Sequence, residues 1–493
     1  MAALRMQIKR IEGAAQLVQD DGGTIMVAAS RPRGFEKLLR GRAPLDAVYM
    51  TQLIGADSGV SHALAAISAW EAATDTGTAQ NGLLLRELLH TLSFLHANLR
   101  QFYFQALPDF IPPSALAAYK GPSPELRRVA QAMGAQPPGS WARHRFPHRF
   151  SDSEINQLAE NQARALRALS LLQRMMAIIG GKFPLVMSIV PGGATTPLRE
   201  PLVFRLRTLM REIGPFLRET PLEDGLLLLE KREETKTLGK GSQAYLSAGT
   251  IGDDTGPEES LFPGGVLFGN TLESFQPNVT ENLQYAFYRV PLKAGGNFQL
   301  LEEAPQKQGA YSWIKAPLYQ ARRAETGALA RLVITHLSGS RSHVAPLVER
   351  IQEVLGVPVL DANTTGGRIL ARLGELHPLV ERCESLLDHL NPGQPTIAKD
   401  NGASKGHGEA VAHIEAPAGI VQHRLVLRNG RIALYDIVSA STWNGAPRDE
   451  NENSSGIELA LNSAGLDLRS ERDRRRASQI VHSYFFSASD AVH

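Results

Sequence analysis

Two short stretches at opposite ends of the chain carry residue types that can do acid–base or metal chemistry. The first, GADSGVSH, holds Asp57, Ser58 and His62, and the second, SASDAVH, holds Ser487 and Asp490 before a final histidine. Carboxylates, hydroxyls and imidazoles can activate water, move protons or bind a hard metal ion. The two stretches therefore predict a new metal or acid–base site built from oxygen and nitrogen donors. The alternative is an inactive site whose side chains are merely polar.

Cysteine usage and charge exclude several other kinds of chemistry. Cys383 is the single cysteine, so this chain has no internal disulfide, no cysteine zinc site and no iron–sulfur cluster of its own. Lys and Arg number 52 against 50 Asp and Glu, a balance that offers nucleic acid no basic surface. The start lacks an apolar signal-peptide core, and no apolar run reaches the roughly 18 residues of a membrane span. We expect no nucleic-acid partner, no direct membrane span, and a location either in the cytoplasm or outside it by export with a partner.

The elements that position these groups are expected to be helical first and mixed later. The 493 residues predict two or three domains or one large intertwined unit. Apolar residues recur at helical spacing from Val60 and from Leu83, whereas Gly, Ser and Thr become frequent after residue 236. We predict an α+β fold, mainly α, with a β-rich segment 1–60, a helical core 60–235, an irregular or β excursion 236–320, and helices, a β-hairpin and a terminal site segment in 321–493.

A series of motifs, in order from end to end, resembles the large subunit of nickel–iron (NiFe) hydrogenases. Each motif alone is weak, but the ordered series is specific. The motifs are RIEG at 10–13, RGFEKLLRGR at 33–42, GVSHALAAISAWE at 59–71, GGKFPLVMSIVPGG at 180–193, IKAPLY at 314–319, ETGALAR at 325–331, GGRILAR at 366–372, IEAPAGIVQH at 414–423 and STWNGAPRD at 441–449. The resemblance implies one intertwined unit over residues 1–493, with a central bundle of long helices and the two ends meeting at one buried site.

The resemblance also locates the metal-binding positions of that family. Its C-x-x-C-x-x-x-H and C-x-x-C-x-x-H motifs supply four thiolates, because nickel and low-spin iron need soft sulfur. Counting back from the two motif histidines places these positions at Gly55, Ser58, Ser487 and Asp490, none of which is cysteine. Ala418 stands where the family has an arginine above the metals. Glycine supplies no ligand, and hydroxyls and carboxylates are hard donors, so we expect no nickel–iron centre.

Other positions of the family pattern are kept. Glu36 and His493 match its magnesium ligands, and the alternative is a plain hydrogen bond between them. Glu12, in the motif RIEG, is expected near His62, beside the cavity that the family's nickel–iron centre would occupy. The alternative is a structural carboxylate. In the family a C-terminal extension is cut off after nickel insertion, and a chain that ends on His493 is expected to need no such step.

Two functions from different classes follow from the resemblance. The first is a nickel-free hydrogenase-like large subunit, paired with an iron–sulfur small subunit in a redox complex and unable to oxidise H2 at a normal nickel–iron centre. The clusters would then belong to the partner, with magnesium the candidate cofactor of this chain. The alternative is a non-catalytic assembly scaffold or regulatory protein of hydrogenase maturation.

Overall fold

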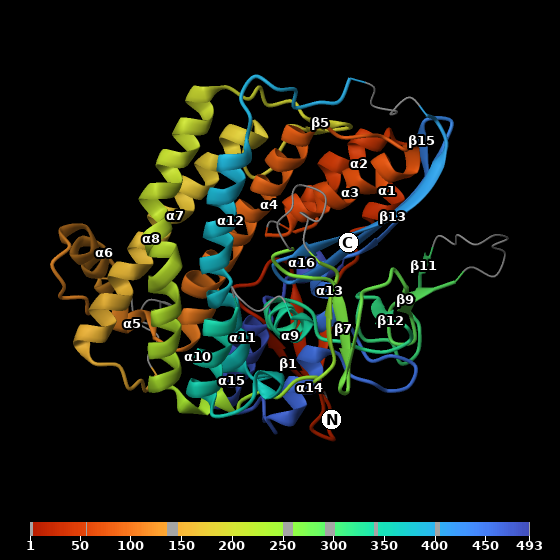
Figure 1. Ribbon diagram of the computed structural model, residues 1–493. Coiled ribbons are helices and arrows are strands. Elements are labelled where there is room, and N and C mark those ends of the chain that lie inside the picture. The colour runs from red at the N-terminus through yellow and green to blue at the C-terminus, as the bar shows by residue number, and fades with distance from the viewer. Residues whose placement is uncertain are drawn as a thin grey trace.

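Long helices occupy one side of the molecule and most of the strands the other, as the computed structural model shows (Figure 1). The structure describes residues 3–55, 57–135, 146–249, 260–290, 301–339, 344–399 and 405–492. This arrangement confirms the predicted α+β fold, mainly α.

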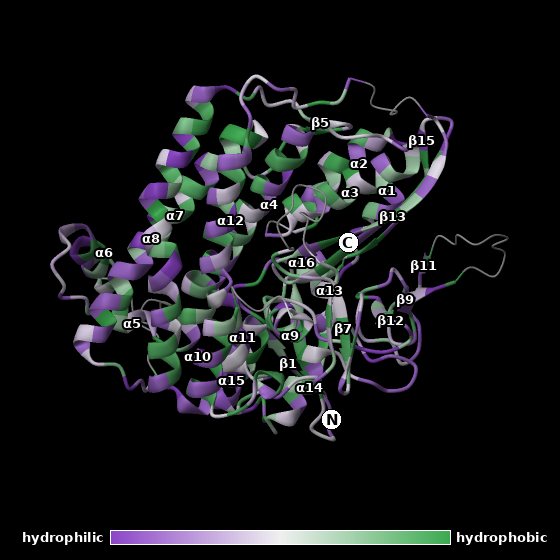
Figure 2. Cartoon of the chain, in the orientation of Figure 1, coloured by the Kyte–Doolittle hydropathy of each residue, from purple (hydrophilic) through white to green (hydrophobic). Residues whose placement is uncertain are grey.

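Four long helices form the predicted bundle. They are α4 (Gln80–Arg100), α7 (Asp152–Gly180), α8 (Glu200–Lys231) and α12 (Leu376–His389). Helix α4 packs against α7 and α12, and α8 packs against the same two. Hydrophilic and hydrophobic residues alternate along α7 and α8, as expected for helices that bury one stripe (Figure 2). Helix α4 is buried along almost its whole length, so it lies at the centre of the bundle.

A buried polar cluster joins three parts of this bundle. Asp224 of α8 accepts a hydrogen bond from the Tyr103 hydroxyl at 2.5 Å and from Asn161 of α7 at 2.9 Å. Tyr103 lies in a π-helical segment, Gln101–Ala106, that continues α4. Burial raises the pKa of Asp224 to about 6, although the hydrogen bonds oppose the shift.

Asp224 therefore makes the stability of the bundle depend on pH. Its folded pKa lies above the unfolded value of 3.8, so its contribution is full below about pH 4 and is lost as pH rises through 6. Relative to the wild type, Asp224→Asn is expected to gain about 3 kcal/mol of unfolding free energy between pH 4 and pH 7. Denaturant unfolding of both proteins at the two pH values measures this gain. An Asn161→Asp variant, which adds a carboxyl at the same place, should show the opposite trend. A difference between Asp224→Asn and wild type that is flat with pH would contradict the prediction.

A three-stranded antiparallel sheet supports the helix that enters the site. Its strands are β13 (Gly408–Ala416), β14 (Gly419–Arg428) and β15 (Arg431–Val438), in the order β13-β14-β15. The predicted hairpin between β14 and β15 turns at Asn429 and Gly430, both with positive φ. Helix α3 (Gly59–Thr74) packs against β13 and β14.

The two ends of the chain lie together. Strands β1 (Leu4–Gln7), β2 (Ala15–Gln19) and β3 (Ile25–Ala29) form an antiparallel sheet that shares one apolar core with α14 (Gly456–Ser463), α15 (Glu471–Ser483) and α16 (Ala488–Ala491). Strands β2 and β3 form a hairpin, and β1 pairs with the other edge of β2. Two backbone hydrogen bonds fasten the ends, from Ser489 to Glu12 and from Arg33 to Val492, each 3.0 Å long.

Short strands fill the described parts of the predicted excursion. The strands of this region and the small hairpin before α8 are β4 (Ile189–Val190), β5 (Gly193–Ala194), β6 (Tyr245–Ser247), β7 (Gly265–Phe268), β8 (Thr271–Glu273), β9 (Val279–Asn282), β10 (Tyr288–Arg289), β11 (Glu302–Glu303) and β12 (Ala316–Tyr319). They pair as β4-β5, β6-β7-β8, β12-β9 and β10-β11. The segment boundaries at residues 60, 235 and 320 stay a prediction.

Shorter helices complete the structure around the bundle and the sheets. They are α1 (Phe35–Leu39), α2 (Pro44–Met50), α5 (Pro113–Leu116), α6 (Pro124–Gly134), α9 (Ala328–Ser338), α10 (Ala345–Leu355), α11 (Thr365–Gly374) and α13 (Ala440–Gly445). Within the described residues no helix is both long and apolar enough to cross a membrane.

Candidate functional site

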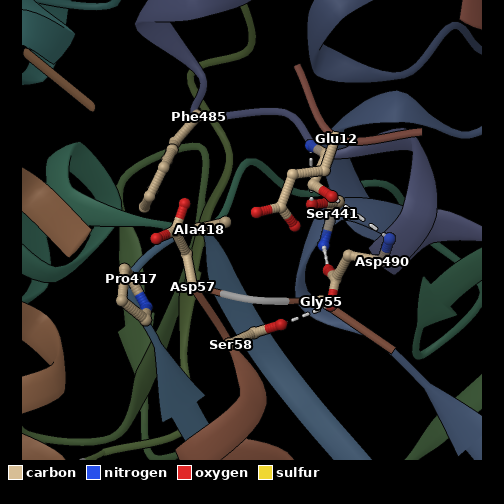
Figure 3. Close-up of a pocket in the computed structure, with 10 residues that line it drawn as sticks. Glu12, Gly55, Asp57, Ser58, Pro417, Ala418, Ser441, Phe485 and Asp490 are labelled. Carbon is tan, nitrogen blue, oxygen red and sulfur yellow. Dashed lines mark hydrogen bonds between the residues drawn. The ribbon is translucent and has the colours of Figure 1, made fainter. Parts of the chain in front are cut away.

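The four positions singled out by spacing line one pocket between the two ends of the chain. Gly55 precedes α3, Ser58 is the residue before its first turn, and Ser487 and Asp490 begin and lie within α16. The pocket has a volume of about 250 Å³, part of it open to solvent. Its other lining residues are Glu12, Asp57, Pro417, Ala418, Ser441 and Phe485 (Figure 3).

The carboxylate of Asp490 is the centre of this site. Its Oδ1 accepts hydrogen bonds from Ser58 Oγ at 2.5 Å and from His62 Nε2 at 3.1 Å, and its Oδ2 accepts from the Ser441 amide at 2.7 Å. Asp490 is 1% exposed. Burial alone would raise the pKa of its carboxyl, but the hydrogen bonds and charge of His62, with Ser58 and Ser441, outweigh burial and hold the pKa at about 2. Asp490 is therefore ionised and links α16 to α3 and α13.

Gly55 has no room for a side chain. A Cβ placed on it would lie 2.7 Å from Ser58 Oγ and 2.9 Å from Asp490 Oδ1. Any side chain at this position would thus point into the Ser58–Asp490 hydrogen bond. In this chain the side chains of Ser58 and Asp490 therefore occupy the space beside Gly55 that a ligand at this position would need.

Serines fix the C-terminal segment above α13. Ser487 Oγ accepts from the Asp490 amide at 3.2 Å and caps α16, while the Ser487 amide donates to Ser441 Oγ at 3.1 Å. The Ser439 hydroxyl donates to the Asp490 carbonyl. These bonds hold α16 against α13 and the residue before it, Ser439.

A chain of ring contacts leads from Asp490 into the sheet. His62 Nδ1 lies 2.9 Å from His423 Nε2, and His423 Nδ1 lies 2.8 Å from the Tyr435 hydroxyl. Since ionised Asp490 only accepts, His62 Nε2 carries a proton, while the donors of the two later contacts depend on the tautomers of His62 and His423. Burial raises the pKa of Tyr435, which keeps this hydroxyl a donor.

Two further carboxylates form the rim of the pocket. Arg100, at the end of α4, donates from Nε to Asp57 Oδ1 at 2.9 Å and from one terminal nitrogen to Glu12 Oε1 at 3.1 Å. Figure 3 shows the Glu12 carboxylate directed into the space between Ala418 and Asp490. Glu12, Asp57 and Ala418 thus line the same pocket as Gly55, Ser58, Ser487 and Asp490.

Glu36 lies in a separate acidic group. Its Oε1 accepts from Lys315 Nζ at 2.9 Å and from the Ile437 amide at 3.0 Å. Lys315 also donates to Glu281 Oε2 at 2.7 Å and lies 3.7 Å from Asp436 Oδ1. Burial, helped by the neighbouring acids, raises the pKa of Glu281 to about 8, against the opposing charge of Lys315.

The predicted pairing of Glu36 with His493 falls partly outside the described residues, because His493 is not among them. Among the residues that are described, no three His, Cys, Asp or Glu side chains are grouped so that they could hold a metal ion. The Lys315 ammonium stands in the middle of the acidic group. The Glu36–His493 magnesium site stays a prediction.

Sequence reasoning missed part of the site. His423 ends the quoted motif IEAPAGIVQH and Ser441 begins STWNGAPRD, yet no spacing rule linked either to His62 or Asp490. Lys315 lies in the motif IKAPLY, but nothing in the sequence linked it to Glu36, and Tyr435 and Ser439 carried no sequence signal. Each becomes part of a site only through contacts between distant segments.

Comparison with known proteins gives one consistent result. A family model described as nickel-dependent hydrogenase matches residues 33–140 and 134–493. The Hydrogenase-2 large chain of Escherichia coli (strain K12) is 24% identical, covering 99% of this chain and 96% of its own length. The periplasmic NiFeSe hydrogenase large subunit of Desulfomicrobium baculatum is 26% identical, covering 99% and 93%. The solved Ni-Fe-Se hydrogenase from D. vulgaris Hildenborough superposes with a TM-score of 0.83 at 24% identity, over 100% of both chains.

Proposed function

This chain belongs to the nickel-dependent hydrogenase large-subunit family, and from that premise we propose that it is a nickel-free member, paired with an iron–sulfur small subunit in a redox complex. On this proposal it does not oxidise H2 at a nickel–iron centre. It contributes instead the frame of a complex whose clusters lie in the partner.

One observation carries the nickel-free proposal. Gly55, Ser58, Ser487 and Asp490 line the same pocket, and the Asp490 carboxylate is already bound by Ser58, His62 and the Ser441 amide. These residues do not fit a nickel–iron centre, because hydroxyls and a carboxylate are hard donors and a side chain at Gly55 would collide with its neighbours. Ala418, on the pocket wall, offers only a methyl group.

Nickel binding to the purified chain tests this proposal. After equilibrium dialysis against a modest excess of Ni²⁺ and removal of loosely bound metal, we expect far less than one nickel per chain. Asp490→Asn should bind equally little nickel, because on this proposal Asp490 is not a nickel ligand. One tightly held nickel per wild-type chain, lost in Asp490→Asn, would contradict the proposal.

An apolar surface beside the pocket supports a protein partner. The Leu53 side chain, two residues before Gly55, is 51% exposed, and Met187 is 41% exposed. The two are neighbours, since Gln52 pairs with the Val186 backbone and the Tyr49 hydroxyl donates to the Met187 carbonyl at 3.4 Å. Exposed apolar groups of this kind are typical of the core of a subunit interface.

Charge introduced on this surface is expected to weaken the complex. Leu53→Arg combined with Met187→Arg should lower partner affinity by about 30-fold, or about 2 kcal/mol, because two charges must be desolvated. Leu166→Arg is the matched control, since Leu166 is 60% exposed on α7. Co-purification from the native host measures the loss. A stable brown complex with clusters supports the redox proposal, whereas a transient complex with maturation proteins favours the assembly or regulatory alternative.

Magnesium is the proposed metal of this chain, with Glu36 and His493 as its ligands. Two observations support this proposal: Glu36, Glu281 and Asp436 bring more negative charge to this place than Lys315 balances, and Glu281 Oε1 has no hydrogen-bond partner within the described residues. When bound, such an ion would supply positive charge between Glu36 of α1 and His493.

Magnesium is expected to raise the thermal midpoint of the wild-type protein. The rise follows from binding to the folded state alone. Glu36→Gln should abolish it, whereas Glu303→Gln, which removes a surface carboxylate paired with Lys37, should not. An equal rise in all three proteins would show that magnesium acts elsewhere.

The compartment follows the partner in this proposal. The D. baculatum relative is described as periplasmic, and the chain is placed either in the cytoplasm or outside it by export together with its partner.

A further inference from the structure

Arginines from distant parts of the sequence meet on one surface, at the end of the bundle where α8 stops. Arg472 and Arg475 lie on α15, and Arg149 lies in the segment that leads into α7. Arg149 and Arg472 are exposed and Arg475 is half-buried. Arg232, the residue after α8, donates to the Pro147 carbonyl at 2.9 Å and so holds the segment of Arg149 beside α8. Below, the arginine cluster means Arg149, Arg472 and Arg475.

Like charges lie close together in this cluster. Burial lowers the pKa of Arg232, and Glu234 opposes the shift. The charges of Arg475 and Arg149 add to the lowering. Burial also lowers the pKa of Arg475, and the charge of Arg472 adds to that shift. The guanidinium groups are thus near enough to repel one another.

Neighbouring acids leave the cluster without a bonded partner. The charges of Glu471 and Asp109 oppose the lowering of the Arg475 pKa. Asp109, however, already accepts from His482 Nδ1 at 2.6 Å and from Arg10. Among the described residues, the side chains of the arginine cluster form no hydrogen bond or ion pair. Their N–H groups are therefore available to an anionic partner.

The composition of the cluster favours a protein as that partner. Its charged residues are all arginine, and the Arg475 guanidinium lies 4.2 Å from the centre of the Phe146 ring. Arginine and aromatic residues are enriched at protein interfaces, where lysine is depleted, and arginine binds carboxylates through two parallel hydrogen bonds. Nucleic acid needs a more extended basic surface, which 52 Lys and Arg against 50 Asp and Glu do not offer.

We propose that the arginine cluster is a docking surface for a protein partner, which it binds through a segment rich in Asp and Glu. The carboxylates of that segment pair with the three guanidinium groups and remove their mutual repulsion. Because the contacts are charged and lie at the surface, binding weakens as the salt concentration rises.

This surface lies apart from the apolar surface at Leu53 and Met187. Arg149 comes just before the first residue of α7, whereas the Met187 amide donates to the carbonyl of Gly180, its last residue, at 2.7 Å. Helix α7 has 29 residues and is about 43 Å long, so the two surfaces lie at its opposite ends. The proposal is therefore independent of the iron–sulfur partner and of whether the first pocket holds metal.

Fluorescently labelled hexaglutamate, titrated against the full-length protein at low salt, tests the proposal by anisotropy. The cluster variant carries Arg149→Gln, Arg472→Gln and Arg475→Gln. We expect it to bind the peptide about 10 times more weakly than wild type, the size of three surface ion pairs. Its thermal midpoint should stay close to that of wild type, because the three side chains form no hydrogen bond within the described residues.

A control variant removes the same amount of charge elsewhere. It carries Arg174→Gln on α7 with Arg205→Gln and Arg211→Gln on α8, all at exposed positions. This variant should bind the peptide as wild type does. An equal loss in both variants would overturn the proposal, since net charge alone would then explain binding. The absence of saturable peptide binding to wild type, or tighter binding of duplex DNA than of the peptide, would also overturn it.

Discussion

Asp490→Ala is expected to lower the free energy of unfolding by about 3 to 5 kcal/mol. Asp490 is a buried, ionised carboxylate, and its removal leaves the Ser58 hydroxyl, His62 Nε2–H and the Ser441 amide without their acceptor. The loss should appear in denaturant unfolding at pH 7 as a lower midpoint with an unchanged slope.

The pH dependence of the free energy of unfolding tests whether the charge of Asp490 causes this stabilisation. Its folded pKa of about 2 lies below the unfolded value of 3.8, so this stability is present above about pH 4 and is lost as pH falls through 2. The part of the unfolding free energy that depends on this titration is about 2 kcal/mol. Asp490→Asn keeps the size of the side chain and should lose that part at pH 7 but little at pH 2.5. Equal losses for Asp490→Asn at both pH values would show that the carboxylate is not the stabilising group.

Cysteine at all four ligand positions is expected to create a site for one soft dication. The variant carries Gly55→Cys, Ser58→Cys, Ser487→Cys and Asp490→Cys, and the four residues line one pocket. Four thiolates from both ends of the chain should bind Cd²⁺ tightly, because sulfur prefers soft metals. At a hundredfold excess over the dissociation constant, binding should add about 2.7 kcal/mol to stability.

Smaller sets of cysteines are the controls for this variant. Gly55→Cys alone is expected to destabilise by about 1 to 3 kcal/mol, because its Cβ would lie 2.7 Å from Ser58 Oγ. Either cysteine pair, from one end only, should bind Cd²⁺ weakly. Thiolate-to-cadmium absorption under reducing conditions measures stoichiometry and affinity. If the four-cysteine variant binds no better than the pairs, the four positions do not share one centre.

Hydrogen bonds join the two ends of the chain at the pocket. A nickel–iron centre would join four thiolates from both ends, whereas here Asp490 of α16 accepts from Ser58 and His62 at the start of α3. Ser439 and Ser441 tie the same segment to the sheet. On the proposal of a nickel-free member, this hydrogen-bonded carboxylate takes the structural place of the metal.

The sequence predicted the family fold and the positions at the pocket, because both are encoded in local motifs. Spacing from a motif histidine was enough to locate Gly55 and Ser58. It was not enough to find the partner of His62, since His423 is 361 residues away and meets it only when α3 packs on β14. Lys315 likewise became visible only when β12 brought it beside Glu36. Local patterns specify elements, whereas side-chain pairs across the core depend on how those elements pack.

The central claim is that this family member works without nickel. Elemental analysis of the protein purified from its native host with its bound partner, together with an infrared spectrum in the cyanide and carbonyl stretching region, tests it most directly. The account predicts no nickel, no such bands, and iron in amounts that match clusters in the partner. Cyanide and carbonyl bands, or stoichiometric nickel, would mean that the metals are held without cysteine and would contradict the claim.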